Sequence, residues 1–178
     1  HVAMRYMPAG CVPQLKRNVN IDAAGRDEIH IGLLSGAFGA DKQAQTWNVS
    51  GSVKHISGGI TNADLRSCLE RYPVHLNIHG PNNPELFVEA RRFAQLLANG
   101  ACVLSQTSHH KDEMEYKDIV YFGTPTALGQ RFSELKQNSA AIRQCRQQTL
   151  EKFCHRFSPT QLLLQSGFGE TLQDLRSG

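Results

Sequence analysis

The sequence predicts an α/β protein built on a parallel sheet. Short apolar runs that suit strands alternate along the chain with longer segments in which apolar residues recur at helical spacing. The stretch from Val74 to Leu104 shows strand, polar loop, helix and strand in turn, which is a βαβ unit and implies two parallel strands. The 178 residues, 40% of them apolar, suit one domain of ordinary size. We therefore expect a Rossmann-like sheet of about five strands, covered by helices on both faces.

The first segments of the chain lead into this alternation. Residues 1–28 are mixed, with a short extended piece at 2–7, proline and glycine breakers, and a polar run over 14–28, and we interpret them as a linker. The compact apolar run at 29–34 is the predicted first strand, and a turn of small residues at Ser35–Gly39 follows it. Small residues let a backbone approach a ligand closely, but this turn lacks the third glycine of a dinucleotide fingerprint.

The alternation continues up to the central unit. We expect a short helix over 41–48 and a strand over 49–56. A helix over 63–72 follows, with Asn62 as its N-cap and apolar residues on one side.

The central unit begins with a strand over 74–78. A Gly-Pro-Asn-Asn loop breaks it, and the last residue of that loop, Asn83, suits the N-cap of a helix with Pro84 at its first position. Asn99–Gly100 ends the helix before an apolar strand over 101–104. Because a helix directs the positive end of its dipole at the preceding loop, this loop suits an anion.

The remaining segments complete the domain. We expect a charged loop over 109–117, a strand over 118–122, and a helix that follows Pro125. A longer helix with an apolar stripe is predicted over 138–156. The predicted organisation is a linker (1–28), a Rossmann-like domain (29–157) and a C-terminal tail with a short capped helix (158–178).

The composition narrows the classes of partner. The net charge of +3 comes from interspersed acids and bases, which argues against nucleic acid and fits a mild preference for anionic small ligands. No apolar run approaches the roughly 18 residues of a membrane span, and no signal sequence is recognisable. Because the chain starts at His1, we expect it to be a domain of a longer protein.

The cysteines favour a reducing compartment. Their number is odd, and they form neither a CxxC motif nor a metal-like pairing with histidine. The sequence therefore predicts a cytoplasmic protein that needs no disulfides. The five cysteines are Cys11, Cys68, Cys102, Cys145 and Cys154.

Polar residues gather where the two central strands end, at 77–83 and 105–108. Ligands of parallel sheets bind outside the carboxyl ends of the strands. A site for a phosphate or a hydroxyl-rich ligand is one interpretation of these residues, and capping and turning of the chain is the other. His79 poses the same choice, since it can donate to a phosphate oxygen or bond to a backbone carbonyl and shape the turn that follows.

A second polar cluster has the composition of a metal site. All of its members lie within one short charged stretch, and their spacing does not bring them together. We interpret the stretch as a solvated loop and expect no metal. The residues are His109, His110, Asp112, Glu113 and Glu115.

Five short motifs stand in order along the chain. They are Arg5-Tyr6-Met7-Pro8-Ala9-Gly10, Asn77-Ile78-His79, Glu89 to Arg92, Leu97-Ala98-Asn99-Gly100 and Val103-Leu104-Ser105-Gln106. The first resembles the linker that precedes the donor-binding half of nucleotide-sugar glycosyltransferases of the two-domain GT-B architecture. The others resemble the N-I-H, E-x-x-R, L-x-N-G and V-x-S-E motifs of bacterial and viral members. The resemblance covers most of the chain.

The resemblance implies a donor and a site. In that family the second half binds the nucleotide diphosphate at a helix N-terminus, and the first half brings the acceptor. Carried over, Asn82 and Asn83 would meet the diphosphate, while Ser35 and Gly36 would line the opposite wall. The substrate-binding residues expected on these grounds and from the strand ends are Ser35, Gly36, Asn77, His79, Asn82, Asn83, Glu89, Arg92, Ser105 and Gln106.

Arg92 has two interpretations within that set. It either contacts the ligand or has a structural role, reaching the strand ends or Glu89. Two departures from the family also matter. Phe87 and Gln95 stand where retaining members of the wider architecture have glutamates, and Gln106 replaces the acid of V-x-S-E. Glutamine can hydrogen-bond a ribose or sugar hydroxyl but cannot act as a base.

Three functions remain open. The first is a glycosyltransferase domain that binds a nucleotide-sugar donor, without a cofactor, for transfer of a hexose or similar sugar to an acceptor on an N-terminal domain. The second is the same fold without catalysis, serving as a nucleotide-binding or partner-binding module. The third is a flavodoxin-like or dinucleotide-binding domain unrelated to sugar transfer.

Overall fold

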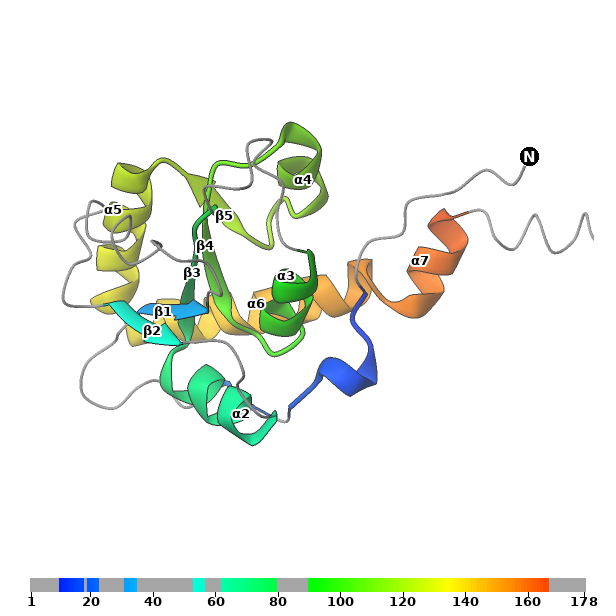
Figure 1. Ribbon diagram of the computed structural model, residues 1–178, viewed down its shortest axis with the longest axis horizontal. Helices are drawn as coiled ribbons and strands as arrows, with labels where there is room; N and C mark the ends of the chain where they lie inside the picture. The colour runs from blue at the N-terminus through cyan, green and yellow to red at the C-terminus, as the bar shows by residue number, and fades with distance from the viewer. Residues whose placement is uncertain are drawn as a thin grey trace, which may run out of the picture.

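The fold is mixed α/β (Figure 1). The computed structural model describes residues 10–17, 19–22, 31–34, 53–56, 62–79 and 90–166. The strands are β1 (Ile31–Leu34), β2 (Val53–Ile56), β3 (Val74–Asn77), β4 (Cys102–Gln106) and β5 (Tyr121–Gly123). The helices are η1 (Pro13–Leu15), α2 (Asn62–Arg71), α3 (Ala90–Leu97), α4 (His110–Glu115), α5 (Pro125–Lys136), α6 (Ser139–Arg156) and α7 (Pro159–Gln165).

The strands form one sheet in the order β2-β1-β3-β4-β5, and every neighbouring pair is parallel. The prediction of a parallel sheet that alternates with helices is therefore confirmed. So is the central βαβ unit, because β3 and β4 pair in parallel with α3 between them in the chain. The number of strands stays a prediction for the whole chain, since segments such as 35–52 lie outside the described residues.

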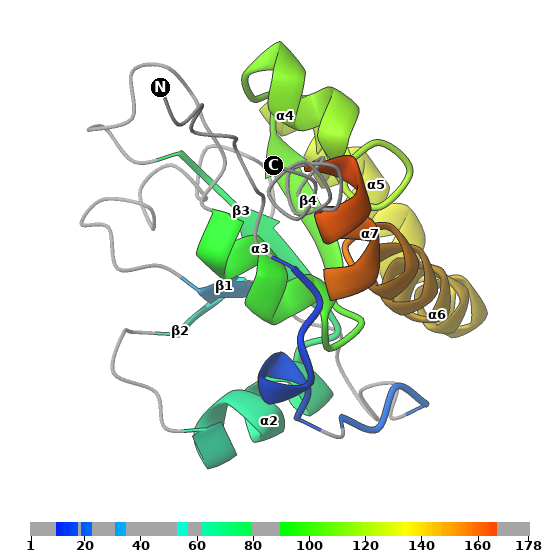
Figure 2. The same ribbon diagram turned by 90° about the vertical axis from the view of Figure 1, so that its right-hand side faces the viewer.

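Two apolar layers sandwich the central strands. Alternate residues of β4 point to opposite faces, so that Leu104 packs with α5 and the start of α6, whereas Val103 packs with α3 and the end of α6. Figures 1 and 2 show the sheet between these helices. The carboxyl ends of β3 and β4 lie side by side in the sheet, and ligands of such sheets bind outside these ends.

Most predicted helices in the described residues are confirmed, because local capping signals specify them. Asn138 caps α6 by accepting a hydrogen bond from the backbone of Ala141 at 3.0 Å, and Ser158 caps α7 in the same way. The predicted helix at 41–48 and the predicted start of α3 at Pro84 lie outside the described residues.

The charged loop predicted at 109–117 is wrong, because its residues 110–115 form α4. His109 caps this helix, with its ring accepting from the backbone of Lys111 at 3.3 Å. Asp112 and Glu113 lie in the first turn, where the helix dipole favours negative charge. The predicted strand at 118–122 also begins later than expected, since Asp118 has a left-handed φ of 64°.

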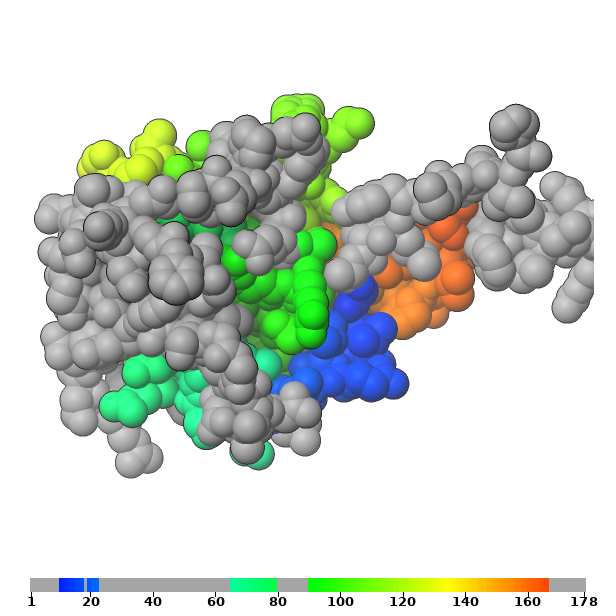
Figure 3. Space-filling model, viewed as in Figure 1, coloured from blue at the N-terminus to red at the C-terminus, as the bar shows by residue number. Residues whose placement is uncertain are grey.

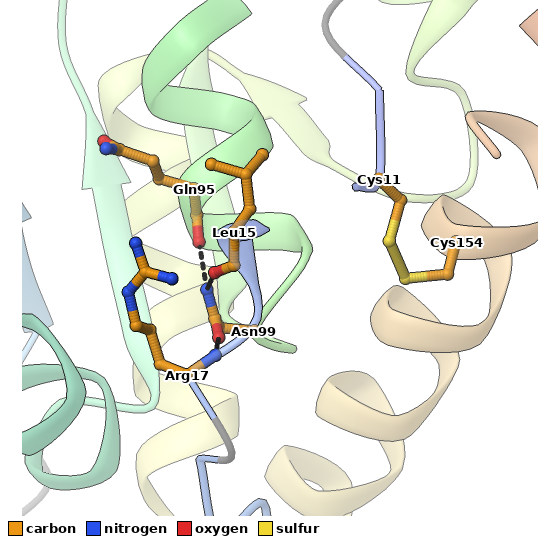
Figure 4. Close-up of a disulfide and its surroundings, with 6 residues drawn as sticks. All are labelled: Cys11, Leu15, Arg17, Gln95, Asn99 and Cys154. Atoms are coloured by element: carbon orange, nitrogen blue, oxygen red, sulfur yellow. Dashed lines mark hydrogen bonds between the residues drawn. A yellow bond between two sulfur atoms is a disulfide. The ribbon is translucent and has the colours of Figure 1, made fainter. Parts of the chain in front are cut away.

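The segment assigned to a linker includes residues that pack on the folded domain. Asn99, which is only 4% exposed, donates to the carbonyl oxygens of Leu15 and Gln95 at 2.9 and 2.7 Å (Figure 4). The side-chain amide oxygen of Asn99, Oδ1, accepts from the backbone N–H of Arg17 at 2.7 Å. In the space-filling view this N-terminal segment lies against α3 and the C-terminal helices (Figure 3). The domain boundary at residue 28 stays a prediction.

A disulfide holds the same segment to α6. It joins Cys11 and Cys154, which lie 143 residues apart in sequence (Figure 4). The backbone of Cys11 also donates to the carbonyl of Phe157 at 2.8 Å. The expectation that all cysteines are reduced is therefore wrong for this pair. Within the described residues, Cys68, Cys102 and Cys145 are free thiols.

Arg146 lies at the opposite end of the sheet from the predicted site. Its side chain is completely buried, and its guanidinium donates to the carbonyl oxygens of Gly100 at 3.2 Å and of Asn20 and Leu69 at 3.4 Å. Burial lowers the pKa of Arg146. Gly100 ends α3 as predicted, with a φ of +67° that few other residues adopt.

No helix in the described part of the chain is long and apolar enough to cross a membrane. A cytoplasmic location stays a prediction.

We expect Asn99→Ala to lower the free energy of unfolding by about 3 kcal/mol, because three hydrogen bonds at roughly 1 kcal/mol each are lost. Urea unfolding measures it. Asn138→Ala is the matched control, since it removes an exposed helix cap and should cost about 1 kcal/mol. Equal losses for the two variants would contradict the anchoring role of Asn99.

His75 makes the fold sensitive to acid. It is completely buried, and neither ring nitrogen has a hydrogen-bond partner among the described residues. Burial lowers the pKa of His75 from 6.5 to about 4. The unfolded chain therefore binds more protons below pH 6.5, so stability is retained above that pH and is lost as the pH falls toward 4.

We expect the free energy of unfolding to fall by about 2 kcal/mol between pH 7 and pH 5 on account of His75. His75→Leu should remove most of this difference, whereas His155→Gln, at an exposed position of α6, should retain it. Urea unfolding at both pH values tests the expectation. A His75→Leu protein with undiminished pH dependence would refute it.

Candidate functional site

Polar side chains meet at the carboxyl ends of β3 and β4. Asn77 and Ser105 stand opposite each other in the strand register, and the Asn77 amide donates to the Ser105 hydroxyl at 2.9 Å. Arg92 donates from Nη1 to the side-chain amide oxygen of Asn77, Oδ1, at 3.0 Å. All three side chains are at most 8% exposed. The structure thus brings together three of the residues that the sequence predicted.

The helix α3 places Arg92 above the strand. Its neighbours Phe93 and Leu96 are completely buried against the sheet, so the helix turns Arg92 inward as well. Arg92 reaches the end of β3, which is the structural alternative expected from the sequence. A buried guanidinium needs hydrogen-bond acceptors, and Asn77 supplies one.

His79 and Gln106 extend this cluster. The backbone N–H of His79 donates to Gln106 Oε1 at 3.3 Å, and the His79 ring bonds through Nε2 to the carbonyl oxygen of Thr107 at 3.0 Å. Because a carbonyl oxygen only accepts, the neutral ring carries its proton on Nε2. Asn77 and Ser105 are buried, whereas Gln106 is half-buried and Thr107 is exposed, so the cluster leads from the core to the surface.

The electrostatic environment keeps His79 neutral at pH 7. Burial is the main cause that lowers the pKa of His79, and the charge of Arg92 adds to it. The bonds to Thr107 and Gln106 and the charge of Asp112 act in the opposite direction, but they do not reverse the shift. A neutral imidazole that is held in place by a hydrogen bond is suited to orienting a ligand. It lacks the positive charge that would attract an anion.

Asp112 is the member of this region that sequence reasoning missed. It is 8% exposed on α4, and its charge acts on His79. The sequence interpretation placed it in a solvated loop, because the spacing of the charged residues at 109–115 did not bring them together. The available signal was the pair of acids at 112–113 directly after a possible N-cap.

Half of the expected site lies outside the described residues. This holds for both residues of the small turn after β1, for two residues of the loop before Pro84 and for the glutamate of the E-x-x-R motif. These residues are Ser35, Gly36, Asn82, Asn83 and Glu89. Their part in the site stays a prediction.

Among the described residues, no group of three or more histidines, cysteines or acids lies close enough together to hold a metal ion. The cluster of Asn77, His79, Arg92, Ser105 and Gln106, which we call the strand-end cluster, consists of amides, a hydroxyl, a neutral imidazole and a guanidinium. Such groups recognise hydroxyls and carbonyls by hydrogen bonds.

Comparison of the sequence with protein-family models and with curated proteins finds no match.

The bond between Arg92 and Asn77 should contribute strongly to stability, because both groups are buried. In a double-mutant cycle with Arg92→Met and Asn77→Ala, we expect a coupling of about 1.5–3 kcal/mol, the range for a hydrogen bond to a charged group. The exposed Arg131–Glu134 ion pair is the matched control, and its coupling should stay below about 0.5 kcal/mol. Similar couplings for the two pairs would contradict a rigid strand-end cluster.

Proposed function

We propose that this chain is the donor-binding half of a nucleotide-sugar glycosyltransferase, with a Rossmann-like sheet as its framework. One observation carries the proposal: the strand-end cluster contains five of the residues that the family resemblance singles out, at the end of the sheet where ligands bind. The transferred sugar would be a hexose or a similar sugar, and the acceptor would be held by another domain.

The strand order supports a ligand at this place. In a doubly wound sheet of order 2-1-3-4-5 the winding reverses between the first and third strands, and ligands bind in the crevice there. Asn77 ends β3, directly beside that reversal. The same order is found in flavodoxin-like domains, so it supports nucleotide binding more strongly than it supports a particular reaction.

Gln106 is the residue with which we expect the ligand to interact. It is half-buried, and its Oε1 accepts from the backbone of His79, which fixes the orientation of its amide. A fixed amide at the mouth of the cluster suits a ribose or sugar hydroxyl. The diphosphate would rest on the helix N-terminus that the sequence predicts at Pro84, without a metal or another cofactor.

The second candidate is a module that binds a nucleotide or a partner without catalysis. The observation that favours it is again Gln106, because a neutral amide stands where the resembled family has an acid. An amide cannot take up a proton from an acceptor hydroxyl. The two candidates share the ligand and differ only in turnover.

We expect nucleoside diphosphates and their sugars to stabilise the protein against heat, by about 2.7 kcal/mol at 100 times the dissociation constant. A thermal-shift panel of UDP, GDP, ADP and CDP compounds in the presence of a chelator measures this. Gln106→Leu should weaken binding by about tenfold through the lost hydrogen bond, and Gln147→Leu, at an exposed position of α6, should not.

Gln106→Glu separates the two candidates. A carboxylate preserves the acceptor for His79 and strengthens the bond to a hydroxyl, so binding should be retained. Hydrolysis of a sugar nucleotide that appears only in this variant supports the non-catalytic module. Failure of every compound in the panel to stabilise the unmodified protein would refute both candidates.

A further inference from the structure

A groove of about 430 Å³ lies between α5, α6 and the β5 edge of the sheet. None of the residues that line it belongs to the strand-end cluster, so it is separate from the proposed donor site. Cys145 lines this groove, together with the guanidinium of Arg131 and the side chains of Gln148 and Thr149. The groove therefore gives small polar molecules access to a thiol.

A second thiol, that of Cys102, packs in the same apolar cluster as Cys145. Cys102, at the start of β4, is completely buried, and its Sγ lies 3.7 Å from the carbonyl oxygen of Ile142. Ile142 and Cys145 are three residues apart on α6, so they share a face of the helix and both pack in the cluster that contains Cys102. The two thiols interact, since each shifts the pKa of the other.

The two thiols are not equivalent. The interaction with the Cys102 thiol lowers the pKa of Cys145; burial opposes this shift, and Thr149 and the charges of Arg131 and Arg146 support it. The same interaction, together with burial, raises the pKa of Cys102. Cys145 lines the groove whereas Cys102 is completely buried, so Cys145 is the thiol that a reagent can reach. Because the thiolate is the reactive form of cysteine, the lowered pKa of Cys145 acts in the same direction.

We propose that Cys145, which lines this groove, is a peroxide-reactive thiol and that Cys102 is its resolving partner. In the first step the Cys145 sulfur attacks one oxygen of hydrogen peroxide. An S–O bond forms, the O–O bond breaks, and hydroxide leaves and takes up a proton from solvent. The sulfur is oxidised to a sulfenic acid, and the peroxide is reduced to water.

In the second step the Cys102 sulfur attacks the sulfur of the sulfenic acid. An S–S bond forms, the S–O bond breaks, and the departing hydroxide combines with the proton from Cys102 as water. In sum, two thiols and one peroxide give one disulfide and two waters. The product would link the start of β4 to α6 on the face of the sheet that α5 and α6 cover.

Cys68 supplies an internal control. It is 8% exposed on α2, and burial raises its pKa to about 11, so little thiolate is present at neutral pH. Exposure to peroxide should therefore distinguish Cys145 from Cys68 within one molecule. We expect Cys145 to react at least about tenfold faster than Cys68.

The test is titration of the full chain with hydrogen peroxide, followed by non-reducing peptide mass spectrometry. We expect a disulfide between Cys102 and Cys145, while Cys68 stays reduced. This measurement needs no variant. An unreacted Cys145, or equal oxidation of Cys145 and Cys68, overturns the proposal.

Two variants test the assigned roles. In Cys102→Ser the sulfenic acid at Cys145 should persist and be trapped by dimedone, and in Cys145→Ser the trapped product should be absent. Circular dichroism confirms that each variant is folded before it is titrated. Oxidation of Cys145 to sulfinic acid in the unmodified protein, with Cys102 still a thiol, overturns the resolving role.

Discussion

The burial of one positive charge constrains much of this structure. Arg146 is completely buried, and burial of an unpaired guanidinium would be prohibitive without acceptors. The acceptors are backbone carbonyls from the N-terminal segment, the end of α2 and the turn after α3. Those three segments must therefore converge on α6 in one arrangement, since a displaced carbonyl would leave a buried donor unsatisfied.

That convergence also positions the strand-end cluster. The turn at Gly100, fixed by Arg146, sets where α3 ends and where β4 begins. The stretch of α3 from Arg92 to this turn places the Arg92 guanidinium at the end of β3. The register of β3 and β4 then sets Asn77 opposite Ser105. Structural support at one end of the sheet thus defines the geometry at the other.

The sequence predicted the features that depend on local signals. The caps Asn138 and Ser158 mark where helices begin, and the Asn99–Gly100 pair marks where α3 ends. Part of the strand-end cluster was predictable for a related reason: Asn77 and Ser105 each end a strand, and parallel strands bring their carboxyl ends together.

Features that depend on distant partners were not predictable. The disulfide joins residues 143 apart, and no pattern around Cys11 or Cys154 identifies the other. The hydrogen-bond acceptors of Arg146 are backbone carbonyl oxygens. Every residue has such an oxygen, so no residue type in the sequence identifies these acceptors. Helix α4 has six residues, which are too few to show an apolar stripe in the sequence. Because the helix was not predicted, the burial of Asp112 was not predicted either.

The disulfide has a mechanical consequence. Because all the strands in the described residues lie between Cys11 and Cys154, the bond closes a covalent ring that contains them and leaves α7 outside. Tension applied to the chain on both sides of this ring would pass across the sulfur bridge without loading these strands. A single cut within the ring would likewise leave both fragments joined until the bridge is reduced.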